Sequence, residues 1–390
     1  MEELTGKRLN HNNKQNTEAL SEFFVCSIEQ VAALHPKARF VFYGRPEPAA
    51  FSAMPHRLPY NISPALFDTC NDKERFRRIV RENGLSTLPD KILPGDALPM
   101  MVASACFSGA RQLVAQDRVG FGGHQTFLLP RGAHQLDPQA HYLVSPFLEQ
   151  SVPVNIHISV FAKGDALVFP GSVQLVEEVD GRLLYMGGDY GLYQGLTAAE
   201  REGCRQMALR CGAILQNLGY RGVAGIDLLL NAGGDPIFLE LNPRFQSSTA
   251  ALNHALARSG RPMVLDAHLE AFRTDRCQFS SDVPPVNESF FAPLLFGDEA
   301  VLDLPDGDMS YDVDDARSSA FSPCGMAAHV FGPTAYPLTE RESGSTLARI
   351  HFPDSIAAID TGRRVRVQPA IQGFGRHKTE FANLRRDQVS

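Results

Sequence analysis

The chain of 390 residues contains no tryptophan, and its seven cysteines include no CxxC pair. An odd, scattered set of cysteines is typical of reduced, packed thiols and argues against a disulfide framework. No apolar run approaches the roughly 18 residues that a membrane span needs. Residues 1–10 are polar and lack the apolar core of a secretion signal. We therefore expect a cytoplasmic protein without a membrane partner.

An excess of positive charge is also missing. Lys and Arg number 37 against 44 Asp and Glu, which gives a formal net charge of −7. A nucleic-acid-binding protein usually carries a basic domain or stripe, so we expect no nucleic-acid partner. The P-loop pattern, HExxH and GxSxG are absent, and the glycines of 120–123 fail GxGxxG because position 125 is Gln.

The residues that are present predict a mixed α/β (α+β) protein. The short apolar run over 38–44 is typical of a buried strand, and residues 21–34 before it favour a helix. The run over 154–162 alternates apolar and polar residues, which predicts a half-buried strand with one polar face.

Two further helices have recognisable start signals. Asn71 can cap a helix, with Glu74 at its third position, and an apolar stripe follows. Thr197 and Glu200 form the same capping pattern before the helix predicted over 198–218.

A hairpin near the middle of the chain carries two acids within apolar strands. A loop over 232–235 places Asp227 directly opposite Glu240, with Asn242 on the same face. Facing carboxylates repel each other, and burial increases the repulsion. A bound cation resolves this, and oxygen ligands of this kind suit Mg²⁺. The alternative is a different register in which one acid faces solvent.

The residues after the second acid complete a specific pattern, Glu240-Leu241-Asn242-Pro243-Arg244, and at this point the chain resembles the ATP-grasp superfamily of ligases. The resemblance continues upstream in the family's order and covers residues 71–250, somewhat under half of the chain. Its segments are the Asp-Lys start at Asn71-Asp72-Lys73, the Gly-rich loop at 120–123, the hinge at Ser145-Pro146-Phe147-Leu148-Glu149, and the strand Val154-Asn155-Ile156-His157.

The resemblance implies an ATP-grasp core of two subdomains, preceded by an N-terminal α/β pre-domain and followed by a C-terminal extension. We place the pre-domain at 1–94, the core at 95–278, and a C-terminal domain on the substrate or acceptor side at 279–390.

The resemblance also implies a reaction. A carboxylate attacks the γ-phosphate of ATP, and an amine or another nucleophile displaces phosphate from the acyl-phosphate. Arg244 is the catalytic cation in this scheme, and Mg²⁺, or Mn²⁺ in its place, is held by Asp227, Glu240 and Asn242. ATP is held by Lys73, Gln116, Gly120, Gly122, Gly123, Ser145, Leu148, Glu149 and Asn155.

Two positions depart from the family pattern. Gln116 stands where the family usually has a second lysine, and Asn155 lies near the place of a family acid. The segment Gln246-Ser247-Ser248 can donate hydrogen bonds to a substrate carboxylate or cap a helix over 250–258. His157 is either a site residue or a structural histidine.

The predicted function is an ATP-dependent carboxylate–amine ligase that forms amide or peptide bonds from small-molecule acids and amines, with amino acids favoured, in small-molecule or antibiotic biosynthesis. An alternative is a ligase that loads an amino acid onto an acyl-carrier-protein thiol, for which the arginines at 363, 364 and 366 could form a docking patch. Another alternative is a nucleotide-binding regulatory protein with a degenerate site. A homodimer is expected from the class alone.

Overall fold

The computed structural model describes residues 17–42, 49–97, 107, 110–119, 126–280, 283, 285–291, 308–312, 327–331, 349–352 and 354–367. The predicted phosphate-loop glycines Gly120, Gly122 and Gly123 lie outside these residues.

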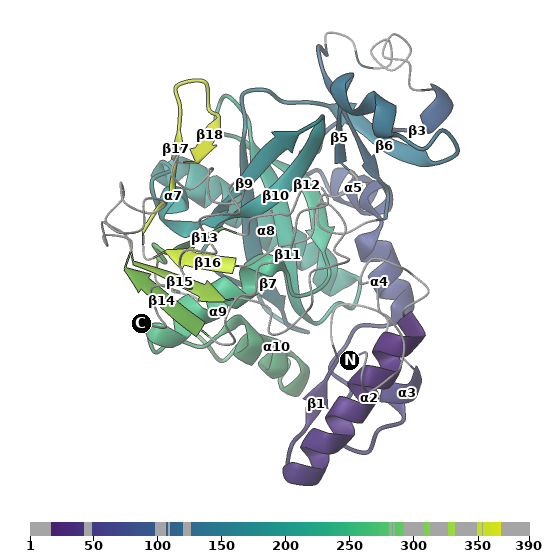
Figure 1. Cartoon of the computed structure of the whole chain (residues 1–390), viewed down its shortest axis with the longest axis vertical. Helices are drawn as coiled ribbons and strands as arrows, with labels where there is room; N and C mark the ends of the chain where they lie inside the picture. The colour runs from purple at the N-terminus through teal and green to yellow at the C-terminus, as the bar shows by residue number, and fades with distance from the viewer. Residues whose placement is uncertain are drawn as a thin grey trace, which may run out of the picture.

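The N-terminal part forms a small unit at the far end of the molecule from strands β3 and β6 (Figure 1). Strand β1 (Phe40–Val41) pairs in parallel with β2 (Arg57–Leu58) beside helices α2 (Thr17–Leu34) and α3 (Ala49–Ser52). The predicted helix and strand are therefore both present here, although the strand has only two residues.

Helices α4 (Pro64–Asn71) and α5 (Lys73–Glu82) lead toward the main sheet. The cap expected at Asn71 is wrong, because Asn71 is the last residue of α4. Asp72 instead has an extended backbone between the helices, and its Oδ1 accepts a hydrogen bond from Arg75 N at 3.1 Å. Lys73 consequently begins α5.

A small antiparallel sheet follows, in the order β3-β6-β4-β5. Its core is apolar, and the rings of Phe127 and Tyr142 meet edge to face at 6.0 Å between centroids. One residue pair, Phe127 with Arg182, joins it to the main sheet. Its strands are β3 (Lys91–Pro94), β4 (Leu113–Asp117), β5 (Thr126–Leu129) and β6 (His141–Pro146), with short helices η2 (Gly95–Ala97) and η3 (Arg131–Gln135).

The main sheet runs in the order β12-β11-β7-β9-β10. Its strands are β7 (Val152–Val160), β9 (Ser172–Val179), β10 (Arg182–Asp189), β11 (Gly222–Leu230) and β12 (Pro236–Asn242), with β8 (Leu167–Val168) beside β7. The alternation predicted near 154–162 is present in β7, but its polar side chains Asn155, His157 and Ser159 are buried too. The half-buried expectation is wrong because helices cover both faces of the strand.

Helix α8 (Ala198–Asn217) packs on the apolar face of the sheet. Its start matches the prediction, since Thr197 and Glu200 form a reciprocal capping box. Helices α9 (Ser247–Arg258) and α10 (Val264–Arg273) cover part of the opposite face and enclose a second apolar core, and short helix α7 (Tyr190–Gln194) follows β10. Among the described residues, α9 and α10 therefore cover part of the polar face of the sheet.

The C-terminal residues add four strands to the main sheet and then form a separate hairpin. Strands β13 (Ser289–Phe291), β16 (Arg349–Phe352), β15 (Ala327–Phe331) and β14 (Asp308–Asp312) continue the sheet from β10 in that order. The last hairpin, β17 (Ala357–Ile359) and β18 (Val365–Val367), is separate. It is anchored by the buried carboxylate of Asp189, which accepts from Ser355 Oγ and Ile356 N at 2.7 and 2.8 Å.

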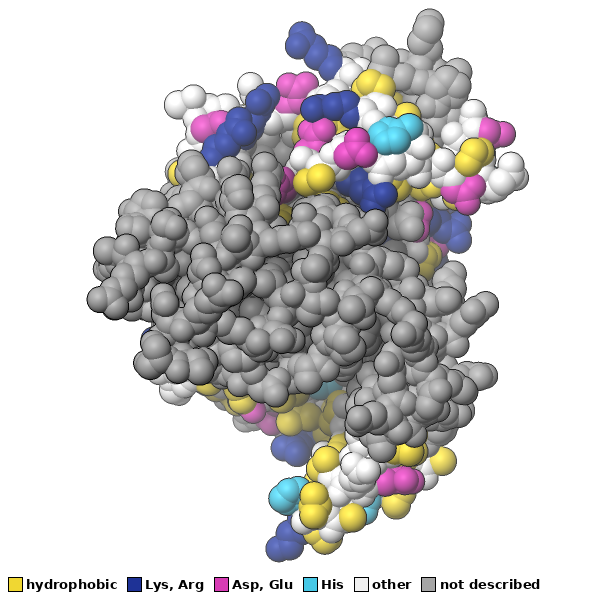
Figure 2. All heavy atoms as spheres, viewed as in Figure 1, with side chains coloured by type: hydrophobic (Ala, Val, Ile, Leu, Met, Phe, Trp, Pro, Cys, Tyr) yellow, Lys and Arg dark blue, Asp and Glu magenta, His cyan; other side chains and the backbone are white. Residues whose placement is uncertain are grey.

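Among the described residues, no helix is long and apolar enough to cross a membrane. Figure 2 shows side chains of both charges close together over the lobe formed by the small sheet. Arg131, whose side chain is 58% exposed, forms an ion pair with the partly exposed Glu178 at 3.0 Å. Near α2 the visible surface is more apolar, and Val31 and Leu34 are exposed there.

Candidate functional site

The hairpin of β11 and β12 places its two acids opposite each other. Asp227 pairs with Glu240 in the antiparallel register, as predicted. The loop is one residue longer than expected, because Leu230 pairs with Pro236, and that register alone would set Leu239 opposite Asp227. An extra residue at Leu239 forms a β-bulge that restores the pairing. Bulges of this kind redirect side chains and are common next to active sites.

The two carboxyl groups lie in a largely dry environment. Asp227 is 6% exposed, and the Glu240 side chain is 23% exposed. Burial and the neighbouring Glu240 raise the pKa of Asp227 to about 8. Burial acts to raise the pKa of Glu240 as well, but the positive charges of Lys73, Arg77 and Arg244 prevail and lower it. Burial therefore opposes a second negative charge on this pair, and a bound cation would compensate that charge.

Three side-chain amides surround Asp227. Its Oδ1 accepts from Asn155 Nδ2 at 2.6 Å and from Gln174 Nε2 at 3.0 Å. Its Oδ2 accepts from Asn242 Nδ2 at 3.0 Å, while Asn242 Oδ1 accepts from Arg244 Nη2 at 3.0 Å. Asn242 can offer its oxygen to a cation only after its amide turns over.

Lys73 links the acids to the small sheet. Its Nζ lies 3.6 Å from Glu240 Oε2 and donates to the carbonyl of Asp117 at 3.2 Å, at the end of β4. The neighbouring Gln116 is also on β4 and is buried. Its Nε2 has no hydrogen-bond partner among the described residues. Among the described residues, this buried amide therefore has a free donor that a ligand could use.

The predicted hinge residues differ in burial: Ser145 lies in the interior, whereas Leu148 and Glu149 line a cavity. Ser145 is buried, and its Oγ accepts from Arg77 Nη1 at 3.0 Å. Leu148 and Glu149 lie further along and line an open cavity of about 470 Å³ with the β11–β12 turn. Glu149 is exposed, and its Oε2 lies 3.8 Å from Arg364 Nη2.

The segment after Arg244 caps helix α9. Gln246 is the N-cap, and its backbone N–H donates to Thr249 Oγ1 at 2.8 Å. A helix is therefore capped here as predicted, but it begins at Ser247 instead of 250, so Ser247 and Ser248 lie in its first turn. Ser248 is buried and donates from Oγ to Asn155 Oδ1 at 3.2 Å, whereas Ser247 is exposed. This end of the helix thus lies against the strand that carries Asn155.

Room for this cap depends on a glycine. A Cβ at Gly225 would collide with the Gln246 side chain. His157 pairs with Gly225 across the ladder, is fully buried, and has its Nε2 2.8 Å from Thr249 Oγ1. Burial lowers the pKa of His157 to about 3, so it is a neutral residue of the interior.

Sequence reasoning missed two residues of this site, Arg77 and Gln174. Arg77 is four positions after Lys73, the spacing that places two side chains on one helix face. Gln174 stands beside Asp227 through the strand order β11-β7-β9, which no local pattern reveals.

Comparison with known proteins identifies similar sequences and folds. Residues 70–248 match the family described as the ATP-grasp domain. The carboxyaminoimidazole ribonucleotide synthase from Aspergillus clavatus, solved with ATP, shares the fold with a TM-score of 0.54 at 14% identity, over 76% of this chain and 70% of that one. The biotin carboxylase domain of Hydrogenobacter thermophilus 2-oxoglutarate carboxylase, solved with MgADP, ADP and bicarbonate, gives 0.51 at 12% identity, over 75% and 64%.

Rhizobium etli pyruvate carboxylase gives a TM-score of 0.55 at 14% identity over 92% of this chain and 33% of that chain. Among curated proteins, the [butirosin acyl-carrier protein]–L-glutamate ligase of Niallia circulans is 30% identical over 91 residues. That match spans 22% of each chain.

Proposed function

Because residues 70–248 make this chain a member of the ATP-grasp superfamily of ligases, we propose that it joins a small-molecule carboxylic acid to an amine at the expense of ATP. The observation that carries the proposal is the pair of facing carboxylates, Asp227 and Glu240, with Lys73 Nζ 3.6 Å from Glu240 and with the positive charge of Arg244 acting to lower the pKa of both acids. A buried pair of acids flanked by cations is suited to a metal–phosphate group.

The donor set fits Mg²⁺. Asp227 and Glu240 supply carboxylate oxygens, and Asn242 supplies an amide oxygen once its side chain turns. No cluster of three His, Cys, Asp or Glu side chains that could hold a metal occurs in the described part of the chain, so the remaining ligands would be water and phosphate oxygens, as Mg²⁺ prefers. When bound, the ion would neutralise charge on the transferring phosphoryl group.

The nucleotide would lie between the small sheet and the hairpin. We assign its phosphates to Lys73, to the amide of Gln116 and to backbone N–H groups of the glycines at 120–123, and its base to the backbone near Leu148. Glu149 is the candidate for the ribose hydroxyls. Ser145 and Asn155 act through their neighbours, since their side chains are buried and already hydrogen-bonded to Arg77 and Asp227.

The proposed reaction has two steps. The acid's carboxylate attacks the γ-phosphorus, which forms an acyl-phosphate and releases ADP; the amine then attacks the acyl carbon, forms the amide, and releases phosphate and a proton. Arg244 is a fixed cation at the site and would stabilise the oxyanion of the tetrahedral intermediate. Gln246, Ser247 and Ser248 at the start of α9 are candidates for binding a substrate carboxylate.

The test is a screen of amino-acid pairs for ADP and phosphate release. We expect release only when both an acid and an amine are present, and we expect Glu240→Ala to abolish it while the protein stays folded. ATP turnover by Glu240→Ala at the wild-type rate would contradict the metal assignment.

A second candidate acceptor is the thiol of an acyl-carrier protein. The 91-residue similarity to a ligase that acts on the butirosin carrier protein favours it. A role in natural-product or antibiotic biosynthesis would follow from the same similarity. Mass spectrometry of a thiol-bearing carrier protein incubated with ATP and each amino acid would show the added residue, whereas amide formation on free amines without any carrier adduct would exclude this candidate.

A further inference from the structure

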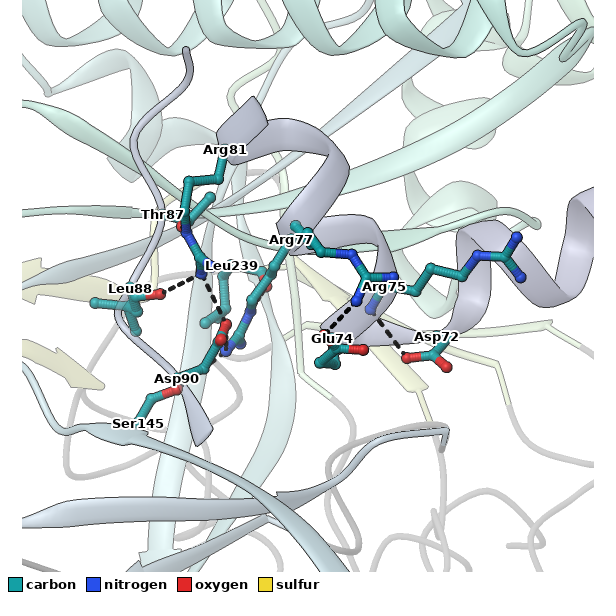
Figure 3. A network of polar contacts seen from close by, with 11 residues as sticks. Asp72, Glu74, Arg75, Arg77, Arg81, Thr87, Leu88, Asp90, Ser145 and Leu239 are labelled. Carbon is teal, nitrogen blue, oxygen red and sulfur yellow. Dashed lines mark hydrogen bonds and ion pairs between the residues drawn. The ribbon is translucent and has the colours of Figure 1, made fainter. Parts of the chain in front are cut away.

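Arg77 is a buried cation that lies beneath the proposed site. It is 1% exposed and stands one helical turn after Lys73 on α5. Figure 3 shows its side chain directed toward Asp90 and Ser145, with Leu239 beside it. Its Nε donates to the carbonyl of Leu239 at 2.7 Å, and its Nη1 donates to Ser145 Oγ at 3.0 Å.

The carbonyl that Arg77 binds belongs to the bulge. A bulge leaves the backbone groups of the extra residue outside the regular ladder, where a buried carbonyl needs another partner. Without Leu239 as an extra residue, the register from Leu230–Pro236 onward would set Glu240 opposite Ile226. Ile226 belongs to the apolar core, so the carboxylate would then leave the face that it shares with Asp227.

The ion pair with Asp90 does not account for the burial of Arg77. The Nη1 of Arg77 lies 3.6 Å from Asp90 Oδ2. Arg81, one turn further along α5, approaches the same carboxylate more closely, at 3.2 Å, with its side chain 47% exposed. Removing a guanidinium from water costs free energy. The hydrogen bond from Arg77 to the carbonyl of Leu239 offsets part of that cost and explains why the guanidinium is buried.

We infer that Arg77 is a positioning residue that holds the Leu239 bulge, and thereby keeps the Glu240 carboxylate beside Asp227 for the metal. The same guanidinium also contacts Ser145 at the end of β6, a buried side chain that does not itself reach the nucleotide in this proposal. This inference rests on the proposed function, because it assigns Arg77 to the metal site proposed there.

The test measures metal binding directly. Electron paramagnetic resonance of free Mn²⁺, titrated into the protein with ADP, gives the Mn²⁺ dissociation constant, and calorimetry with ADP and EDTA gives the metal-free nucleotide affinity. For Arg77→Met we expect Mn²⁺ binding at least tenfold weaker and ADP affinity within about threefold of wild type. Arg81→Met is the matched control and should leave both unchanged. Arg77→Lys, which keeps the charge but cannot reproduce the planar fork, should lie between the two.

Each alternative outcome is decisive. Wild-type Mn²⁺ affinity in a folded Arg77→Met protein overturns this inference and leaves the proposed function standing. If Arg77→Met does not fold, wild-type Mn²⁺ affinity in Arg77→Lys overturns the inference instead. If neither variant folds, the inference is overturned because Arg77 then serves the stability of the fold. A wild-type protein that binds no Mn²⁺ in the presence of ADP overturns the metal site itself.

Discussion

Replacing Asp189 by Ala should loosen the C-terminal hairpin and lower stability measurably. The carboxylate is fully buried, and burial raises its pKa, although its hydrogen bonds oppose that shift. It accepts four hydrogen bonds, from Leu192 N at 2.7 Å, Ser355 Oγ at 2.7 Å, Ile356 N at 2.8 Å and Ala357 N at 3.1 Å.

The expected loss of unfolding free energy follows from the backbone N–H donors that would lose their acceptor. Ile356 and Ala357 are buried, and their N–H groups would lose their acceptor. An unsatisfied buried donor costs about 1–3 kcal/mol, so the two together give about 2–6 kcal/mol. Detachment of residues 354–367 would limit that loss, because the donors would then reach water.

Urea unfolding and limited proteolysis measure the two consequences. We expect Asp189→Ala to lose at least about 2 kcal/mol of unfolding free energy and to be cleaved faster within 354–367. Asp360→Ala removes a less buried acceptor in the same hairpin and serves as the control, with a loss below about 1 kcal/mol. A folded Asp189→Ala protein with wild-type stability and cleavage rate would refute the anchoring role.

Three other predictions concern the site and its buried histidines. Gly225→Ala should push the Gln246 side chain from its place and cost about 1–3 kcal/mol of stability; an unchanged melting temperature and turnover would contradict this. Arg244→Ala should depress turnover more than ATP affinity, and an equal loss of ATP binding in calorimetry would assign Arg244 to the nucleotide instead. Burial lowers the pKa of His157 to about 3 and of His268 to about 4, below the unfolded value near 6.5. Both are neutral in the fold, so their contribution is complete above pH 6.5 and is lost as pH falls toward 4 and 3, by up to about 2 kcal/mol each at pH 5; a His268→Gln protein whose urea midpoint changes between pH 7 and pH 5 as much as that of wild type would oppose this.

The elements that carry the chemistry were predictable because local patterns encode them. The capping box of Thr197 and Glu200 predicted α8, and a hairpin loop placed at 232–235 predicted that Asp227 and Glu240 face each other. The pairing arises differently from the prediction, since a longer loop is compensated by the bulge at Leu239. A bulge depends on what supports it from outside the strand, so the hairpin sequence alone does not reveal it.

The remaining parts of the site depend on contacts between segments distant in sequence. Gln174 reaches Asp227 because β9 and β11 both flank β7, and Arg77 reaches Leu239 because α5 packs against β12. Asn71 had the correct capping spacing, but the preceding helix extends through it and leaves the cap to Asp72. Tertiary packing decides all three cases.

The most direct test of the metal–nucleotide site is the effect of Mg²⁺ on ATP binding, measured by calorimetry in wild type and in Glu240→Gln. We predict that Mg²⁺ raises ATP affinity at least tenfold in wild type and less than twofold in the variant, with similar affinities for both proteins in EDTA. An equal gain from Mg²⁺ in the two proteins would contradict the assignment of Glu240 to the metal.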